Sequence, residues 1–170
     1  MSEFPLIRAA VTDDASGIAQ IYSESILARD STMDTEPVSE ADILLLLESL
    51  TKREAVFVIL TESGLQGWGI VKEYSDRPGY AVACETSVYL FRESLRQGLG
   101  KLLQSRLLEF AQSAAYHHVV TKIWADNDSS IAFHRSCGFT LVGVQKEVGR
   151  VDGVWRDVAI MQCLLDKENS

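Results

Sequence analysis

One stretch of the sequence, residues 81–124, limits the possible folds more than any other. A strand expected over 81–91 precedes a loop with two glycines, and a helix expected over 99–115 leads into a strand over 119–124. The helix is amphipathic, and its spacing predicts four inward side chains: Leu102, Leu103, Leu107 and Phe110. A strand, a helix and a strand in this order form a crossover, which places the two strands parallel in one sheet.

Most of the other predicted strands are linked by short turns, which favours antiparallel pairing. Three lie before the crossover and two after it, over residues 6–10, 55–61, 68–74, 141–148 and 154–164. Together with the crossover they predict an α/β fold, in which one domain over residues 1–170 has a mixed, mostly antiparallel central sheet and helices on both faces. A length of 170 residues suits one domain with one sizeable core.

Capping residues mark where the other helices should begin and end. Thr12, followed by two aspartates, is expected to cap a helix of about four turns, because carboxylates favour the positive end of a helix. Ser39 is expected to cap a second helix that continues through 43–50, with an aspartate three residues on. A short helix over 129–137 should end at Gly138, since a left-handed C′ position favours glycine.

Composition excludes several classes of protein. The net charge is −8, from 16 basic and 24 acidic side chains, whereas nucleic acids and anionic membranes call for a basic surface, so neither partner is expected. Small cationic or zwitterionic substrates stay compatible with this charge. Cys84, Cys137 and Cys163 are too widely spaced for a disulfide framework, and no paired motif indicates a metal. Without a visible leader or a membrane-spanning apolar run, the expected location is cytoplasmic.

The loop before the helix over 99–115 has the features of a phosphate site. Gly98 and Gly100 lack Cβ atoms, so the backbone can approach a ligand closely. Free N–H groups of the first helical turn then point at an anion, and Arg96 and Lys101 add positive charge. A glycine-containing turn before a surface helix explains the same residues, and neither a Walker loop nor GxGxxG is present. The loop alone supports both interpretations equally.

Short motifs in a fixed order surround this loop. They are Asp34-Thr35-Glu36-Pro37, Glu85-Thr86-Ser87-Val88-Tyr89, Gly98-Leu99-Gly100, Asn127-Asp128-Ser129-Ser130 with His134, Gly138-Phe139, Val148-Gly149, Gly153, Trp155 and Asp157. Each motif is weak alone, but their order and spacing together are specific. On these motifs the chain resembles the GNAT superfamily over nearly its whole length, and within it the phosphinothricin and methionine sulfoximine N-acetyltransferases.

The resemblance implies direct transfer of acetyl from acetyl-CoA to the primary amine of a small amino acid such as phosphinothricin or methionine sulfoximine or sulfone. The amine arrives as ammonium, so a base must remove a proton before attack. Glu85 matches the family position of that base, which acts through water, and His134 matches a position that could relay a proton or protonate the leaving thiolate. Apart from the resemblance, Glu85 is a strand carboxylate in a salt bridge or solvent, and His134 is a packed helix histidine.

The resemblance also assigns residues around the cofactor. Backbone N–H groups of Val88 and Leu90 would bind the pantetheine arm where a splayed strand leaves them unpaired, and Tyr89 could line the groove or belong to the core. Asn127 matches a cofactor contact and would also cap the following helix. The implied cofactor-binding residues are Val88, Tyr89, Leu90, Arg96, Gln97, Gly98, Leu99, Gly100, Lys101 and Asn127, and no metal is implied.

Three residues are candidates for contact with the acceptor. Arg77 and Tyr80 could meet its carboxylate or oxyanion, because an arginine fork suits either group, and Glu36 could face the amine. An exposed turn and a solvated loop acid explain the same residues. The family implies a homodimer with the substrate pocket near the interface. Two alternatives stay open: an acetyltransferase for another amine, such as a polyamine or a peptide N-terminus, and a catalytically silent acyl-CoA sensor.

The chain departs from the family pattern in three places. Leu95 stands where a glutamine or arginine usually opens the phosphate loop, so binding there should depend on backbone N–H groups, with Arg96 as a substitute. The other departures concern the substrate side and question the identity of the amine more than the chemistry. They are Arg150-Val151-Asp152 in place of a lysine-containing loop, Met33 in place of an aromatic residue, and Ala81 in place of a basic one.

Overall fold

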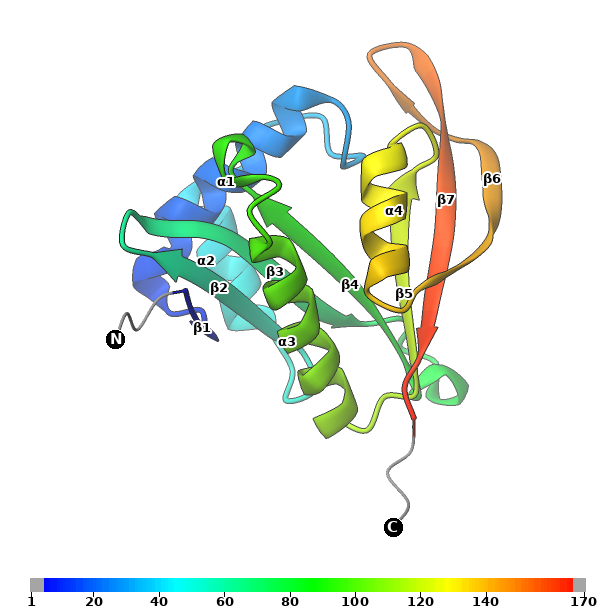
Figure 1. Ribbon diagram of the computed structural model, residues 1–170, viewed down its shortest axis with the longest axis horizontal. Helices are drawn as coiled ribbons and strands as arrows, with labels where there is room; N and C mark the ends of the chain where they lie inside the picture. The colour runs from blue at the N-terminus through cyan, green and yellow to red at the C-terminus, as the bar shows by residue number, and fades with distance from the viewer. Residues whose placement is uncertain (1–4, 167–170) are drawn as a thin grey trace.

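The computed structural model describes residues 5–166, and over these residues the chain forms one α/β domain (Figure 1). The strands are β1 (Leu6–Ala9), β2 (Ala55–Thr61), β3 (Gly64–Glu73), β4 (Ala83–Leu90), β5 (His118–Trp124), β6 (Thr140–Val151) and β7 (Val154–Leu164). The α-helices are α1 (Ala15–Ala28), α2 (Glu40–Ser49), α3 (Leu99–Ser113) and α4 (Asp128–Ser136), and the 3₁₀ turns are η1 (Thr12–Asp14), η2 (Pro78–Tyr80) and η3 (Arg92–Ser94).

The strands form one seven-stranded sheet in the order β1-β2-β3-β4-β5-β7-β6. Only the pair β4–β5, which the crossover through α3 connects, is parallel among the described strands, and every other neighbouring pair is antiparallel. The mixed, mostly antiparallel sheet predicted from the order of the segments is therefore confirmed. β3 begins at Gly64, four residues earlier than expected, because it pairs with β2 from the hairpin turn onward.

Helices cover both faces of the sheet, as predicted. On one face, Ile18 of α1 and Ile43 of α2 pack with Val58 and Trp68 of β2 and β3. The opposite face carries α3 and α4, which lie in front of the sheet in Figure 1. There, Leu103 and Leu107 of α3 are fully buried in a cluster formed with Phe57, Val71 and Met161. This division matters for the site, because it determines which side chains of β4 and β5 face which layer.

One of the two predicted helix caps is confirmed and the other is wrong. The Ser39 side chain accepts a hydrogen bond from the Asp42 N–H, and the Asp42 carboxylate accepts one from the Ser39 N–H, which is a complete capping box. Thr12 instead begins η1, and α1 starts at Ala15. The Asp14 carboxylate accepts from the Val11 N–H (2.8 Å) and pairs with Arg8 (2.6 Å), so a strand-to-turn ion pair replaces the expected threonine cap.

The remaining local predictions are also tested by the structure. Gly138 has φ +91° directly after the C-cap of α4, as its predicted C′ position requires. Leu102, which the helical spacing assigned to the core, is 45% exposed, so that assignment is wrong. Among residues 5–166, no helix has the length and apolar character needed to cross a bilayer.

Leu103 and Leu102 provide a matched test of the α3 packing. Leu103→Ala removes a side chain that is 0% exposed and should lower the free energy of unfolding by roughly 2–5 kcal/mol, since the cavity cannot fully collapse. Leu102→Ala, one residue away and 45% exposed, should cost less than about 1 kcal/mol. Urea unfolding of both variants measures the difference. Equal losses would contradict the helix orientation.

Candidate active site

The two parallel strands separate part-way along their length. β4 and β5 form three residue pairs, from Ala83 with His118 to Glu85 with Val120, and over the described residues their pairing goes no further. Each strand stays paired on its other side, β4 with β3 through Leu90 and β5 with β7 through Trp124. A wedge therefore opens between them, as the diverging ribbons in Figure 1 show.

The edge of β4 that faces the wedge presents backbone groups. The N–H of Phe91 donates to the carbonyl of Gln66 on β3 (3.0 Å), and the carbonyl of Ala83 accepts from Tyr74 on the same side (3.2 Å). Because successive residues of a strand direct their backbone groups to alternate neighbours, the even-numbered residues of β4 point toward β5. Beyond Glu85 that neighbour has moved away. The N–H groups of Val88 and Leu90 consequently face the open wedge.

The chain leaves β4 through η3 and a loop with two left-handed residues, Arg96 (φ +63°) and Gly98 (φ +80°). Gly98 is the N-cap of α3, and the Leu102 N–H donates to the Gly98 carbonyl (3.4 Å) in the first turn. The N–H groups of the three residues between them precede the helical ladder and have no intrahelical acceptor. Three such donors at the positive end of a helix have the chemistry to bind an anion.

The two glycines of this loop have different structural roles. A Cβ on Gly100 would lie 3.4 Å from side-chain atoms of Leu90 and Phe133, so the absence of one lets α3 begin close to β4 and α4. A Cβ on Gly98 would contact nothing within 4 Å, so that position requires glycine for its positive φ. One glycine shapes the loop and the other allows close packing behind it.

Side chains around the loop hold it in place. Ser94 is buried and donates to Gln66 Oε1 (2.5 Å), which ties η3 to β3. Gln97 Nε2 donates to the Glu93 carbonyl (3.0 Å), while Leu95 is 45% exposed. The Ser94–Gln66 bond was not anticipated from the sequence, because its members lie 28 residues apart.

His134 lies on α4 facing the sheet and is 6% exposed. Its Nδ1 lies 2.8 Å from the Ser130 carbonyl, and since a carbonyl only accepts, Nδ1 carries the proton. Nε2 is then an acceptor, and it is buried without a hydrogen-bond partner among residues 5–166. Burial lowers the pKa of His134, opposed by the hydrogen bond to Ser130. The histidine is therefore held neutral with one free lone pair.

Glu85 lies at the apex of the wedge, as the last residue of β4 paired with β5. Its Oε2 accepts a hydrogen bond from Lys122 Nζ of β5 at 3.0 Å. Sequence reasoning did not single out Lys122. A signal was present, because Lys122 is the exposed, charged residue within a strand whose neighbours at Thr121 and Ile123 are buried.

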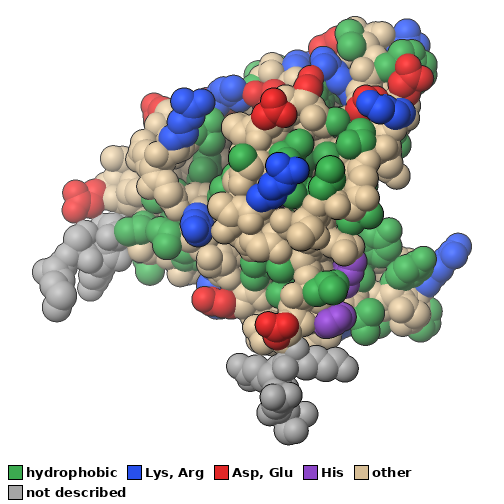
Figure 2. Space-filling view, turned by 45° about the vertical axis from the view of Figure 1, so that its right-hand side comes forward, with side chains coloured by type: hydrophobic (Ala, Val, Ile, Leu, Met, Phe, Trp, Pro, Cys, Tyr) green, Lys and Arg blue, Asp and Glu red, His purple; other side chains and the backbone are tan. Residues whose placement is uncertain are grey.

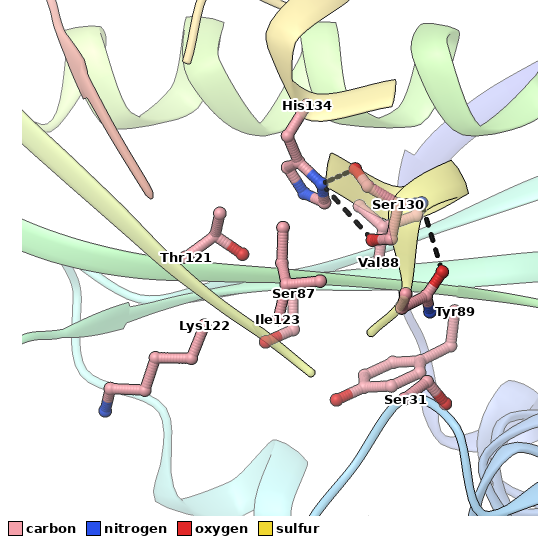
Figure 3. A pocket seen from close by; sticks show the side chains of 10 residues that line it. Ser31, Ser87, Val88, Tyr89, Thr121, Lys122, Ile123, Ser130 and His134 are labelled. Carbon is pink, nitrogen blue, oxygen red and sulfur yellow. Dashed lines mark hydrogen bonds between the residues drawn. The ribbon is translucent and has the colours of Figure 1, made fainter. Parts of the chain in front are cut away.

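A cleft of about 370 Å³ occupies the wedge. Its lining comes from four segments: Ser31 after α1, Ser87, Val88 and Tyr89 of β4, Thr121, Lys122 and Ile123 of β5, and Asn127, Ser130 and His134 at α4. Figure 3 shows His134 on one side of the strands and the side chains of Lys122 and Tyr89 extending to the other. The cleft thus reaches both layers, with a neutral histidine on the α3–α4 side and Lys122 on the opposite side. Glu85 is not among the lining residues and adjoins the cleft through its ion pair with Lys122.

Comparison with known proteins identifies the family. The protein-family model that describes the acetyltransferase (GNAT) domain matches residues 7–160 of this chain. The chain belongs to the GNAT acetyltransferases. The resemblance drawn from the sequence motifs is thereby confirmed, and the protein is an enzyme of the N-acetyltransferase class.

Relatives of this GNAT domain extend over nearly the whole chain. The L-amino acid N-acyltransferase MnaT of Escherichia coli K12 is 28% identical over 95% of this chain and 94% of its own. An L-methionine sulfoximine/L-methionine sulfone acetyltransferase of Salmonella typhimurium is 29% identical over 95% of each chain. The crystal structure of a phosphinothricin acetyltransferase from Sinorhizobium meliloti, in complex with acetyl-CoA, has a TM-score of 0.90 and 33% identity, covering 97% of this chain and 90% of that one.

Asn127 connects the cleft of the GNAT domain to the loop after α1. Its Oδ1 accepts from the Ser130 N–H (3.1 Å) and caps α4, while its Nδ2 donates to the Asp30 carbonyl (3.0 Å). The Asp30 carboxylate pairs with Arg92 of η3 at 2.9 Å. The predicted capping role of Asn127 is confirmed, and Asp30 links α4 to the segment that precedes the phosphate loop.

The departure at residues 150–152 has a structural role. Asp152, at the turn of the β6–β7 hairpin, pairs with Arg29 at the end of α1 (2.9 Å). A Cβ on Gly149 would lie 2.7 Å from the Met33 sulfur, so Met33 packs directly against the hairpin. Arg150 stacks on Trp155, 5.2 Å from the ring centroid. These contacts dock the hairpin onto the loop that also contributes Ser31 to the cleft.

The structure does not gather every predicted site residue around this cleft. Arg77 and Tyr80 line a second pocket of about 300 Å³, together with Arg53, Glu73 and Tyr116. Glu36 is exposed in the loop before α2 and is absent from the residues that line the cleft. Tyr89 lines the cleft and also packs in the core, with ring centroids 5.1 Å from Trp68 and 4.8 Å from Tyr22.

The neutral state of His134 predicts a pH dependence of stability. Its folded-state pKa is below the usual 6.5, so the unfolded chain binds a proton that the folded protein excludes as pH falls through that value. Wild type should lose more stability than His134→Gln between about pH 7.5 and pH 5. Urea unfolding at both pH values measures the two losses. Parallel losses would mean that His134 titrates normally in the folded protein.

Proposed function

We propose that this GNAT domain transfers acetyl from acetyl-CoA directly to the primary amine of a small amino acid, such as phosphinothricin or methionine sulfoximine or sulfone. The observation that carries the proposal is the wedge itself, with open N–H donors on one strand and Glu85 at its apex. The names of the relatives, which include amino acid, methionine sulfoximine and phosphinothricin acetyltransferases, support the acceptor class.

The residues present fit acetyl-CoA. The free N–H groups at the start of α3 suit the pyrophosphate, with Arg96 and Lys101 adding charge, and those of Val88 and Leu90 suit the pantetheine arm. Acetyl-CoA supplies an acetyl thioester, whose carbonyl such donors polarise. Gln97 and Leu99 contribute backbone to the same loop, and Asn127 is linked to the segment before it through Asp30, which pairs with Arg92. Because Leu95 is apolar, the backbone carries this binding.

Glu85 acts as the general base in this proposal. Its carboxylate pairs with Lys122 and is 30% exposed, which suits removal of a proton from an ammonium through a water molecule. His134 lines the cleft and its Nε2 is unprotonated, so its proposed role is to accept and relay a proton rather than to begin as a donor to the thiolate. The two groups border the wedge from its two sides.

Other parts of the proposal rest on the family. Glu36, Arg77 and Tyr80 stay candidate acceptor contacts, although none of them lines the cleft and Arg77 and Tyr80 line the second pocket. A homodimer is supported by the apolar side chains exposed on β6 and β7, among them Val142, Val148 and Trp155. Figure 2 shows hydrophobic side chains in several groups on this side, with both kinds of charge between them. We place the enzyme in the cytoplasm.

A panel assay that detects free CoA thiol tests the proposed reaction. Methionine sulfone, methionine sulfoximine and phosphinothricin should be acetylated in preference to a polyamine and to a peptide N-terminus. If only the polyamine or the peptide is acetylated, the proposed amino acid acceptor is wrong, although acetyl transfer to an amine still holds. Binding of acetyl-CoA without turnover of any amine would favour the sensor alternative.

Gly98→Val tests the role of the phosphate loop. A β-branched residue resists φ +80°, so the loop should rearrange and the Kd for acetyl-CoA should rise roughly 10-fold or more. Gly64→Val is the control, because Gly64 has φ +98° and an open Cβ direction but lies in the β2–β3 hairpin. Calorimetric titration measures both, and Leu95→Gln should improve binding by less than Gly98→Val weakens it. Equal weakening by the two valine variants would refute the assignment.

Glu85→Gln tests the general base. Loss of the base should lower kcat at neutral pH by roughly 100-fold or more, while the Kd for acetyl-CoA stays the same. Glu109→Gln is the control. It removes a different ion-paired carboxylate, which lies on α3, and should leave kcat unchanged. Unchanged turnover in Glu85→Gln would show that another group removes the proton.

A further inference from the structure

Glu85 is flanked by two lysines on one face of the sheet. Lys122 of β5 contacts its carboxylate at 3.0 Å. Lys72 of β3 is its paired residue across β3–β4, so the side chains of Lys72 and Glu85 leave the sheet on the same face. The apex of the wedge therefore holds one carboxylate between two cations. This excess of positive charge goes beyond what a base for a cationic amine requires.

The Glu85–Lys122 pair is open to exchange. The two side chains are 30% and 50% exposed, and exposed ion pairs contribute little to stability. An incoming charged group can therefore separate the pair at small cost. Lys122 lines the cleft beside Ser87 and Glu85 does not, so an acceptor that approaches Glu85 from the cleft meets the Lys122 ammonium group.

An α-amino acid carries the charges that match both members of the pair. Its ammonium and carboxylate are attached to one carbon, and covalent geometry keeps a carboxylate oxygen about 3 Å from the nitrogen. The Lys122 Nζ and Glu85 Oε2 atoms are separated by 3.0 Å. When the ion pair opens, the substrate ammonium can take the place of Lys122 on Glu85, and the substrate carboxylate can take the place of Glu85 on Lys122.

We propose that Lys122 binds the carboxylate of the acceptor and thereby selects amino acids over simple amines. The inference rests on the proposed function, because it assigns Glu85 to the amine. An amine without a carboxylate would displace Lys122 from Glu85 and leave two cations close together with one anion between them. Repulsion between Lys122 and the ammonium of such an amine disfavours its binding. Lys122 therefore contributes to specificity by repelling simple amines as well as by attracting the carboxylate of an amino acid.

The test compares an amino acid with its carboxamide, which keeps the amine and side chain but lacks the negative charge. For wild type and Lys122→Met, kcat/KM is measured with methionine sulfone and with methionine sulfone amide at one pH. The variant should lose roughly 10- to 100-fold on the acid and change less than about 3-fold on the amide. Lys122→Arg should keep most of the preference, since arginine also binds carboxylates.

Lys146→Met provides the control, because Lys146 forms an exposed ion pair with Asp157 at 2.9 Å on the β6–β7 hairpin. It should leave both acceptors unaffected. An equal loss on acid and amide in Lys122→Met would overturn the inference and assign Lys122 to the positioning of Glu85. If wild type acetylates neither compound while acetylating another amine, the proposed acceptor class fails instead, which is a separate result.

Discussion

The parting of β4 from β5 is the constraint on which the rest of this structure depends. Each strand is hydrogen-bonded to another strand on its outer side. β4 pairs with β3 as far as Leu90, and β5 pairs with β7 as far as Trp124. Their mutual pairing ends at Glu85 with Val120. Backbone donors in the middle of a sheet would otherwise be consumed by a neighbouring strand. Here the N–H groups of Val88 and Leu90 stay open, and the backbone alone offers hydrogen-bond donors to a ligand.

Packing around the wedge explains how it can stay open. α3 starts close to both β4 and α4, because a Cβ on Gly100 would lie 3.4 Å from side-chain atoms of Leu90 and of Phe133. Two ion pairs also fix the loop after α1. Asp30 pairs with Arg92 of η3, and Arg29 pairs with Asp152 in the β6–β7 turn. The cleft is therefore bordered by four segments that hold one another, although they are distant in sequence. A displaced anchor such as Asp30 would disturb both the α4 cap and the segment before the phosphate loop.

The sequence was sufficient for features that depend on local pattern. Hydrophobic periodicity and turn residues predicted the order of strands and helices, and the crossover predicted the parallel pairing of β4 with β5. The motifs also identified Glu85, His134 and Asn127, which the structure brings to one wedge. Features that depend on register were not predictable. Lys122 meets Glu85 only because β4 and β5 pair from Ala83 with His118, and Thr12 failed as a cap because Arg8 reaches Asp14 from a neighbouring strand.

The central claim is that the open edge of β4 and the first turn of α3 bind acetyl-CoA. Amide NMR spectra of isotope-labelled protein, recorded during titration with acetyl-CoA, test it directly. The account predicts the largest shifts at the N–H groups of Val88 and Leu90 and at the three residues that follow Gly98, with small shifts in β1 and β2. Saturating binding with the largest shifts on β1 and β2, and none at Val88 and Leu90, would contradict it.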